Sequence, residues 1–317
     1  MSDDAAAPAY HVPVLAEPIL ALGAGARRVV DGTLGHGGHA QRFLAAGAEV
    51  LGIDRDPDAI ATASARCASP RLRTVTAAFD APMALAAAAA FRPDVVLLDL
   101  GVSSRQLDDA GRGFTFRPGA PLDMRMGDEP RSAADWLNAA GEAELARAFA
   151  DFGDEPKARG LAREVARRRA RQPFATSDDL VNAIRAALGP RSGPGDFARL
   201  FQAVRIAVNR ELEALEAALP AYRDALVPGG RLLVLTYHSG EDRIVKQAFR
   251  AWAGACTCPP GLPACACGAV ALGTLDPRKP LMADDAEVAG NVRARSARLR
   301  GFRVAGRGAG GQEGSGM

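Results

Sequence analysis

One stretch near the start of the chain constrains the fold more than any other. Two valines and an aspartate at 29–31 precede four glycines within 32–38, a density that no helix interior accommodates. The pattern predicts a buried strand that enters a tight turn, and 41–46 then carry their apolar side chains on one side of a predicted helix. Because glycine has no Cβ, the backbone between Gly35 and Gly38 can approach a ligand and present its N–H groups at a helix N-terminus. The stretch therefore indicates a nucleotide-type cofactor site.

The glycine turn by itself does not identify the cofactor, because Gly35-x-Gly37-x-x-Ala40 also fits the dinucleotide fingerprint. A second predicted strand at 50–54 ends in Asp54, where a carboxylate suits hydrogen bonds to a ribose diol. Nicotinamide, flavin and S-adenosylmethionine cofactors are all compatible with these two elements.

Acidic residues end three of the predicted strands. Asp31 and Asp54 end the first two, and Asp99 ends an apolar run at 94–99 that is typical of a strand buried on both faces of a parallel sheet. An open α/β sheet holds its ligand at the carboxyl ends of its strands. Three carboxylates would repel a pyrophosphate but attract the sulfonium and ammonium groups of S-adenosylmethionine. The pattern therefore favours S-adenosylmethionine.

Two further predicted strands lead to candidate site residues. The strand at 71–76 leads to Phe79, whose ring either stacks on a bound adenine or belongs to the core. The strand within 226–236 is entered through a proline-glycine turn that methyltransferase sheets commonly have and dehydrogenases usually lack. His238 follows this strand, as either a general base or a structural group that holds the next helix by a hydrogen bond.

A long stretch between the fourth and fifth predicted strands has a helical pattern. Helices are expected at 132–150, 157–171, 177–188 and 200–219, with a glycine- and proline-rich break at 189–195. The expected fold is α/β, a class I Rossmann-like methyltransferase sheet with an inserted helical domain. Its parts are methyltransferase segments at 1–108 and 199–305, a helical substrate-recognition domain at 109–198 and a flexible tail at 306–317.

Composition bounds the class of protein. The chain has 317 residues, of which 48% are hydrophobic and 24% charged, so it can bury a large core. No apolar run reaches membrane-spanning length without a charge or a helix breaker, and the N-terminus lacks the basic start of a signal peptide. We therefore expect a cytoplasmic protein without a membrane partner. A net charge of +2 is too small to indicate a nucleic-acid partner, so that inference depends on where the arginines cluster.

The arginines cluster in two places. Arg159, Arg163, Arg167 and Arg171 recur every fourth residue, so they line one face of a predicted helix, either as a solvated face or as a phosphate-binding one. A second basic cluster lies at 291–300.

Four cysteines lie close together in the sequence. Cys256, Cys258, Cys265 and Cys267 do not have the spacing of common zinc ribbons, and a Pro-Pro-Gly run separates the two pairs. A loop without metal is the favoured interpretation, so no metal site is predicted, although zinc stays open.

Seven motifs, spread over nearly the whole chain, resemble those of the bacterial 16S ribosomal RNA cytosine-N4 methyltransferases. They are HVPVL at 11–15, DGTLGHGGH at 31–39, LDLGVSSRQLD at 98–108, RGFTF at 112–116, PLDMRM at 121–126, FQAVRIAVN at 201–209 and HSGEDR at 238–243. The resemblance implies S-adenosylmethionine as cofactor and the 16S rRNA of the small ribosomal subunit as partner. The implied product is N4-methylcytidine in the P site of the decoding centre, at position 1402 in the usual bacterial rRNA numbering.

The resemblance also implies roles for individual residues. Gly37, Gly38 and His39 would hold the methionine end of the cofactor, Asp54 its ribose and Phe79 its adenine side, and Asp99 and Gln106 would close the pocket. Two positions depart from the family pattern, because Gly240 stands in place of the usual leucine and Val292 in place of proline. Neither change removes a polar group, so only the local loop shape is in doubt.

The chemistry of a cytosine amine requires a proton acceptor. Its lone pair is delocalised into the ring, so the enzyme needs a group that takes a hydrogen bond from the amine and later its proton. Asp99 is the first candidate and His238 the second. The target base is expected to leave its stack, with Arg125, Arg205, Arg295 and Arg298 holding the phosphates around it.

Two other functions stay open from the sequence. The glycine turn is also compatible with a nicotinamide-dependent oxidoreductase, and the fold with a non-catalytic RNA-binding ribosome assembly factor. The sequence does not decide whether the chain forms a homodimer, or whether its substrate is naked RNA or an assembled subunit.

Overall fold

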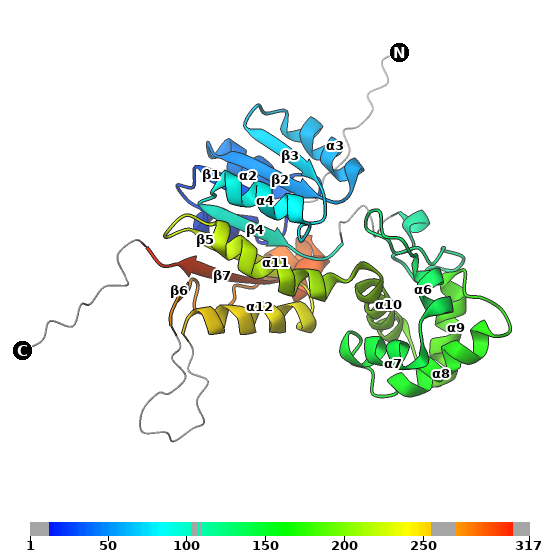
Figure 1. Cartoon of the computed structure of the whole chain (residues 1–317). Coiled ribbons are helices and arrows are strands. Elements are labelled where there is room, and N and C mark those ends of the chain that lie inside the picture. The colour runs from blue at the N-terminus through cyan, green and yellow to red at the C-terminus, as the bar shows by residue number, and fades with distance from the viewer. Residues whose placement is uncertain (1–12, 103–106, 108, 255–269, 307–317) are drawn as a thin grey trace, which may run out of the picture. The chain divides into compact units, whose positions relative to one another are not determined.

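The chain folds into two compact units. The computed structural model describes residues 13–102, 107, 109–254 and 270–306. One unit combines the chain up to Leu100 with the chain from Ala218 onward, and the other is formed by Gly101–Ala217 (Figure 1). The second unit is thus larger than the helical domain expected at 109–198. It also includes 101–108 and 199–217, which the sequence analysis placed in the methyltransferase segments.

A sheet organises the first unit. Among the described residues it has seven strands in the order β3-β2-β1-β4-β5-β7-β6. The strands are β1 (Arg28–Asp31), β2 (Glu49–Asp54), β3 (Leu72–Thr76), β4 (Val95–Asp99), β5 (Arg231–Thr236), β6 (Gly273–Leu275) and β7 (Arg298–Val304). β1 to β5 pair in parallel, whereas β7 is antiparallel to both β5 and β6. The sheet confirms the predicted Rossmann-like methyltransferase fold, because dinucleotide-binding sheets lack this antiparallel strand.

The register brings the ends of the parallel strands to one edge. Asp31 pairs with Gly52 of β2 and with Leu97 of β4, so each neighbour continues two residues beyond it. Those extensions end in Asp54 and Asp99, the last residues of β2 and β4. The three acids therefore lie on adjacent strands at the carboxyl edge.

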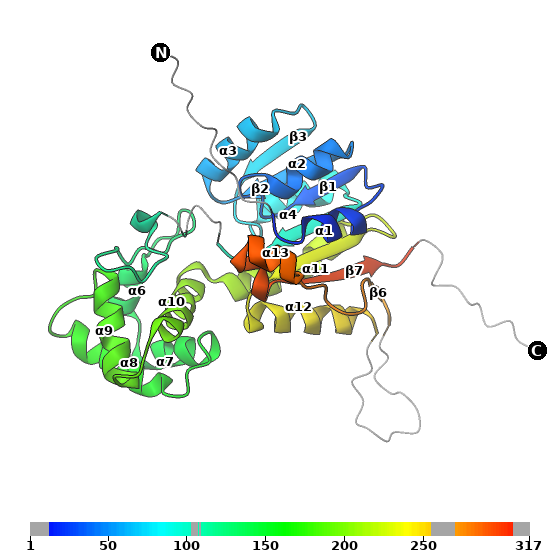
Figure 2. The same ribbon diagram turned by 180° about the vertical axis from the view of Figure 1, so that it is seen from behind.

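Helices cover both faces of this sheet (Figures 1 and 2). They are α1 (Ala16–Leu22), α2 (Gly38–Ala45), α3 (Pro57–Cys67), α4 (Pro82–Phe91), α12 (Ser239–Trp252), α13 (Asp285–Gly290) and the 3₁₀ helix η2 (Val292–Ser296). On one face, Ile19, Phe43 and Ala63 from α1, α2 and α3 share a core with strand residues such as Val29 and Leu97. On the other face, Phe249 and Trp252 of α12 pack against Phe302 of β7.

The second unit is helical around its own core. Its helices are η1 (Ala110–Arg112), α6 (Ala133–Ala139), α7 (Glu142–Asp151), α8 (Ala158–Arg169), α9 (Ser177–Leu188) and α10 (Pro194–Asn209), and α11 (Glu211–Ala225) leads back into the first unit. The core includes Trp136, Phe149, Ile184, Phe201 and Val204. The bounds of α9 agree with the predicted helix at 177–188.

Two of the predicted helices are each divided in the structure. The helix expected at 132–150 is interrupted at Ala140 and Gly141, which both adopt extended backbone angles, and Arg169 donates to the carbonyls of Leu137 and Ala140 that the interruption exposes. The helix expected at 200–219 already begins at Pro194, since proline is tolerated in a first turn. It ends where Arg210 adopts left-handed angles.

The basic cluster at 291–300 contains part of a strand that the sequence analysis missed. In β7 the buried Leu299 and Phe302 lie on opposite faces of the strand, and Arg298, Arg300 and Arg303 stand around them, so no alternation of apolar and polar residues marks the strand. Asp242 of α12 accepts hydrogen bonds from Arg298 and Arg300. The strand is therefore joined to α12 by charge as well as by aromatic packing.

None of the described helices combines the length and the apolar character that a membrane span requires.

Removal of the Phe302 ring should destabilise the first unit. The side chain is fully buried between Phe249 and Trp252, so Phe302→Ala should lower the free energy of unfolding by about 3–5 kcal/mol. Phe302→Leu, which keeps most of the volume, should cost less than half as much. Urea denaturation followed by circular dichroism measures both. Equal stability of the wild type and Phe302→Ala would show that this aromatic cluster does not hold β7.

Candidate functional site

The glycine turn between β1 and α2 lies at the carboxyl edge of the sheet. Gly37 has a φ of 75°, and a Cβ there would come within 3.1 Å of Cys67 Sγ and of the Ala63 Cβ on α3. A Cβ on Gly35, by contrast, would meet no atom closer than 4.0 Å, although its φ of 50° also favours glycine. The turn is therefore packed against α3 at Gly37 and open at Gly35. Gly38 is the first residue of α2.

Asp54 holds the turn in place. Its Oδ2 accepts a hydrogen bond from the Gly35 N–H at 2.8 Å and its Oδ1 accepts one from the Asp56 N–H at 2.9 Å. Burial raises the pKa of Asp54 above the usual value for aspartate. Each carboxylate oxygen has two lone pairs, so the half-buried carboxylate can also accept hydrogen bonds from a ribose diol.

Asp99 is held by two hydrogen bonds, and its second carboxylate oxygen accepts none from the described residues. Its N–H donates to Thr33 Oγ1 at 2.6 Å, and its Oδ1 accepts a hydrogen bond from the Tyr237 hydroxyl at 2.8 Å. Its Oδ2 lies 3.6 Å from His39 Nε2, and its side chain is 25% exposed. Among the three acids of this edge, Asp99 thus combines a fixed position with access from solvent.

Asp31 is the buried acid of the group. Only 1% of the residue is exposed. Among the described residues its carboxylate accepts one hydrogen bond, from the Thr33 N–H, at the long distance of 3.4 Å. Burial, with a smaller contribution from the nearby Asp99, raises the pKa of Asp31 to about 7, although His39 opposes the shift. A cation bound at this edge would favour the ionised form.

His39 carries an unpartnered polar atom. Its Nε2 is buried and makes no hydrogen bond within the described parts of the chain, because the 3.6 Å to Asp99 is too long. Buried polar atoms of this kind ordinarily have a partner. Together with the carboxylates and the open space at Gly35, the unpartnered atom fits a polar, cationic ligand such as S-adenosylmethionine.

Phe79 follows β3, and the structure leaves its two interpretations open. The residue is half-buried, and its carbonyl accepts a hydrogen bond from the fully buried Tyr222 hydroxyl at 2.8 Å. The backbone at Phe79 is therefore fixed. Its ring is neither fully enclosed in the core nor fully free to stack on a base.

His238 has the contacts of a helix cap. It is the N-cap of α12, where its Nδ1 lies 3.4 Å from the Glu241 N–H and its Nε2 lies 3.2 Å from Glu241 Oε1. The other oxygen of Glu241 accepts hydrogen bonds from the N–H groups of Tyr237 and His238. The side chain is only 10% exposed, and its Nε2, like that of His39, makes no hydrogen bond among the described residues. His238 therefore caps α12, and its role as a general base stays a prediction.

Two of the four candidate phosphate-binding arginines lie in the first unit. Residue Arg298 pairs with Thr236 at the carboxyl end of β5, so it lies at the same edge as Asp99. Its guanidinium is within 3.2 Å of Asp242. Arg295 is exposed on η2, just before this strand.

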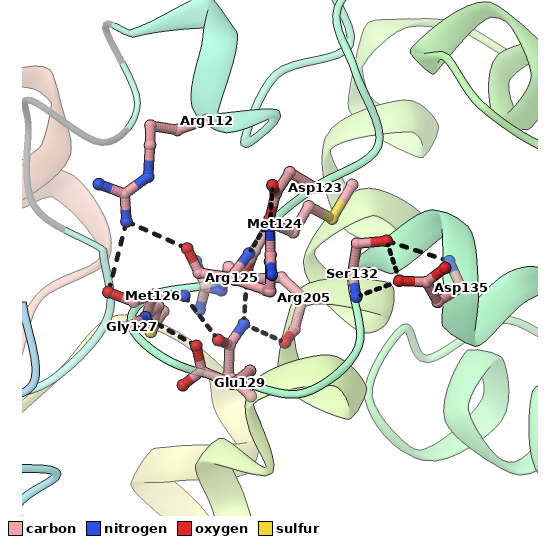
Figure 3. A network of polar contacts seen from close by, with 11 residues as sticks. Arg112, Asp123, Met124, Arg125, Met126, Gly127, Glu129, Ser132, Asp135 and Arg205 are labelled. Carbon is pink, nitrogen blue, oxygen red and sulfur yellow. Dashed lines mark hydrogen bonds and ion pairs between the residues drawn. The ribbon is translucent and has the colours of Figure 1, made fainter.

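The other two lie in the second unit, each paired with an acidic residue, and Figure 3 shows the pair of Arg125 with Asp123. Arg125 forms two hydrogen bonds with Asp123, at 2.8 and 2.9 Å. Arg205 forms two with Glu211, at 2.9 and 3.0 Å, and its side chain is only 13% exposed. Arg205 can therefore reach a phosphate only if this half-buried pair opens.

The side-chain amide of Asn209 joins two sequence motifs of the second unit, those at 121–126 and 201–209. Asn209 accepts a hydrogen bond from the Met126 N–H at 2.9 Å and donates to the Met124 carbonyl at 2.8 Å. Arg112 donates to the carbonyls of Arg125 and Met126 from the opposite side (Figure 3). These contacts fix the segment at 124–126, in which the buried Met124 has a φ of 59°.

Several sequence candidates lie outside the described residues. They are Gln106 and the cysteines at 256, 258, 265 and 267.

Comparison with known proteins decides the family. The model of the MraW methylase family matches residues 8–305. The chain belongs to the MraW methylase family. Curated relatives support this assignment. A ribosomal RNA small subunit methyltransferase H from Gemmatimonas aurantiaca is 54% identical over 301 residues, which span 93% of this chain and 96% of the relative. A protein of the same name from Myxococcus xanthus is 48% identical over 278 residues, 86% of this chain and 90% of the relative.

Sequence reasoning missed three residues that shape the site of this methylase. Thr33 and Tyr237 hold Asp99, and Tyr222 holds the backbone at Phe79. Thr33 lies inside the motif at 31–39, and Tyr237 directly precedes the motif at 238–243. Both motifs contain residues to which the sequence analysis assigned roles. Tyr222 lies 143 residues from its partner, and local sequence carries no signal for such a contact.

The affinity of the methylase for S-adenosylmethionine should depend on pH through Asp31. Its pKa of about 7 means that the carboxyl group loses its proton between pH 6 and pH 8. Because the ionised form attracts a cation, affinity should rise by about tenfold over this range and then level off. Asp31→Asn should bind more weakly and remove most of the rise. Isothermal titration calorimetry measures these affinities.

S-adenosylhomocysteine provides the matched control, since it lacks the sulfonium charge. Its affinity should change much less with pH. If both ligands give the same flat profile, Asp31 does not act on the sulfonium.

Proposed function

We propose that this methylase transfers the methyl group of S-adenosylmethionine to N4 of a cytidine in 16S rRNA, at position 1402 in the P site of the small subunit. Its membership of the MraW methylase family and relatives named ribosomal RNA small subunit methyltransferase H support the RNA substrate. The observation that supports N4 chemistry best is the fixed, accessible carboxylate of Asp99 at the edge where the cofactor is expected. Action on ribosomal RNA makes the cytoplasm the proposed location.

The cofactor residues proposed from the sequence all border the glycine turn or the strand ends. Gly37, Gly38 and His39 are assigned to the methionine end of the cofactor, and Asp54 to its ribose. Phe79 is assigned to its adenine side, while Gln106 keeps the role that the family resemblance implies. When bound, S-adenosylmethionine supplies an electrophilic methyl group on a cationic sulfur.

Asp99 is proposed as the proton acceptor. An ionised carboxylate only accepts hydrogen bonds, so it attracts the N4 amine of cytosine and repels the O4 carbonyl of uracil. The hydrogen bond keeps electron density on the amine nitrogen while the new N–C bond forms and the S–C bond breaks. The proton released from N4 then passes to Asp99, and a neutral thioether leaves. His238, enclosed with Glu241 at the cap of α12, is assigned a supporting role.

The substrate is proposed to reach this edge as an extruded base. Arg298 lies at the edge and Arg295 on the preceding turn, so they are the first candidates for contacts with the flanking phosphates. Arg125 and Arg205 remain candidates from the second unit, although acidic partners hold both. Membership of a methylase family argues against the nicotinamide-dependent oxidoreductase. A non-catalytic assembly factor remains the alternative that the following experiment addresses.

Loss of the Asp99 carboxylate should abolish methyl transfer but not cofactor binding. In Asp99→Asn, kcat for transfer of labelled methyl to small-subunit RNA should fall at least about 100-fold, because the acceptor is gone. Asp285→Asn, which changes an exposed acid on α13, should stay within about twofold of the wild type. Mass spectrometry of the digested RNA identifies the modified nucleoside. A wild-type protein that binds the RNA but never yields N4-methylcytidine would falsify the proposal and favour the assembly factor.

Binding of the RNA should weaken with salt through the arginines at the edge. Arg295→Gln should reduce the slope of log affinity against log salt concentration by about one unit, because one phosphate contact is lost. Arg92→Gln alters an exposed arginine at the amino end of β4, on the opposite edge, and should leave the slope unchanged. Filter binding at several salt concentrations measures both variants. Equal slopes for the wild type and Arg295→Gln would exclude Arg295 from the interface.

A further inference from the structure

We propose that Tyr237 is a positioning residue for methyl transfer, which engages one oxygen of Asp99 and thereby leaves the other to accept the proton of the substrate amine. The inference rests on the proposed function, because it assumes that Asp99 is the acceptor. It adds a residue that neither the sequence motifs nor the comparisons assign to the reaction.

The two oxygens of Asp99 have different surroundings. Oδ1 accepts a hydrogen bond from the Tyr237 hydroxyl at 2.8 Å, whereas the one polar contact of Oδ2 among the described residues is His39 Nε2, at 3.6 Å. The main chain of Asp99 is fixed as well, through the Thr33 hydroxyl. Rotation of the carboxylate would break the Tyr237 hydrogen bond, so Oδ2 stays the oxygen with the larger free acceptor capacity.

Tyr237 is itself held firmly. It follows directly after β5, the strand that neighbours β4, and its N–H donates to Glu241 Oε2 at 2.8 Å. Its ring packs against the core shared by the sheet and α1, α2 and α3. Since its backbone and its ring are both fixed, the hydroxyl has a defined position from which to orient Asp99.

The phenol can act only as a hydrogen-bond donor to Asp99. Burial, followed by the proximity of the Asp99 carboxylate, raises the pKa of Tyr237 well above its ordinary value. The hydroxyl therefore keeps its proton throughout the working range of pH. It cannot serve as the base, which leaves proton acceptance to Asp99.

Charged and titratable groups surround the pair on each packed element. They are Asp31 on β1, His39 on α2, Glu241 on α12 and Glu287 on α13. Three of these four are acids and disfavour a further negative charge on Asp99. A hydrogen bond from Tyr237 opposes them, because donation to a carboxylate stabilises the ionised form.

The test is Tyr237→Phe in the full-length enzyme, which removes one oxygen and keeps the ring. With small-subunit RNA as substrate, kcat should fall about ten- to a hundredfold, the range expected when a hydrogen bond to a charged group is lost. The dissociation constant of S-adenosylmethionine should change by less than about threefold. The acid limb of the kcat profile should move to higher pH, since ionised Asp99 is then less stable.

Ser177→Ala is the matched control. It also removes a buried hydroxyl that donates a hydrogen bond, but to the Arg117 carbonyl in the second unit at 2.6 Å rather than to Asp99. It should lower stability to a similar degree and leave the acid limb in place. Thermal unfolding of both variants shows whether any loss of rate merely reflects loss of fold.

The outcomes separate the inference from the proposed function. A wild-type enzyme that makes N4-methylcytidine and a Tyr237→Phe variant with unchanged kcat and pH profile would overturn the role of Tyr237 alone. A fall in kcat with an unmoved acid limb would do the same, because a purely structural defect has that signature. Absence of N4-methylcytidine with the wild type would instead refute the proposed function.

Discussion

The parallel alignment of β1, β2 and β4 is the constraint on which the site depends. Each strand ends in an aspartate, and the register places the three acids on adjacent strands at one edge. Negative charge at partly buried positions is costly, and each acid meets that cost differently. Asp54 accepts two backbone N–H groups, Asp99 accepts a tyrosine hydroxyl, and Asp31 has a pKa near neutrality. The folded chain therefore favours a positive charge at this edge, and the proposed cationic methyl donor would supply it.

Much of this edge could be predicted from the sequence because its signals are local. A continuous apolar run such as 95–98, followed by Asp99, indicates a buried parallel strand. The glycines at 35 and 37 indicate a turn that only glycine readily adopts, and both have positive φ. These signals predicted the strands, and the strand pairing of the structure confirms them. The carboxyl ends of parallel strands share one edge, so the position of the three acids could be predicted as well.

The parts that escaped prediction depend on contacts between distant residues. Arg298 and Arg300 of β7 contact Asp242 on α12, so a strand that is buried through Leu299 and Phe302 resembles a basic surface segment in sequence. Helix interruptions at Gly141 and Arg210 reflect packing within the second unit, which overrides a continuous helical pattern. Likewise, the role of Tyr237 becomes visible only when β5 is placed beside β4.

A crystal structure of the methylase with S-adenosylmethionine is the most direct test of the central claim, that the acidic edge binds a cationic methyl donor. The account predicts the ribose on Asp54, the methionine end at Gly37 to His39, and the sulfonium on the side of Asp31 and Asp99. A donor bound elsewhere, or bound with its sulfonium away from these carboxylates, would contradict it.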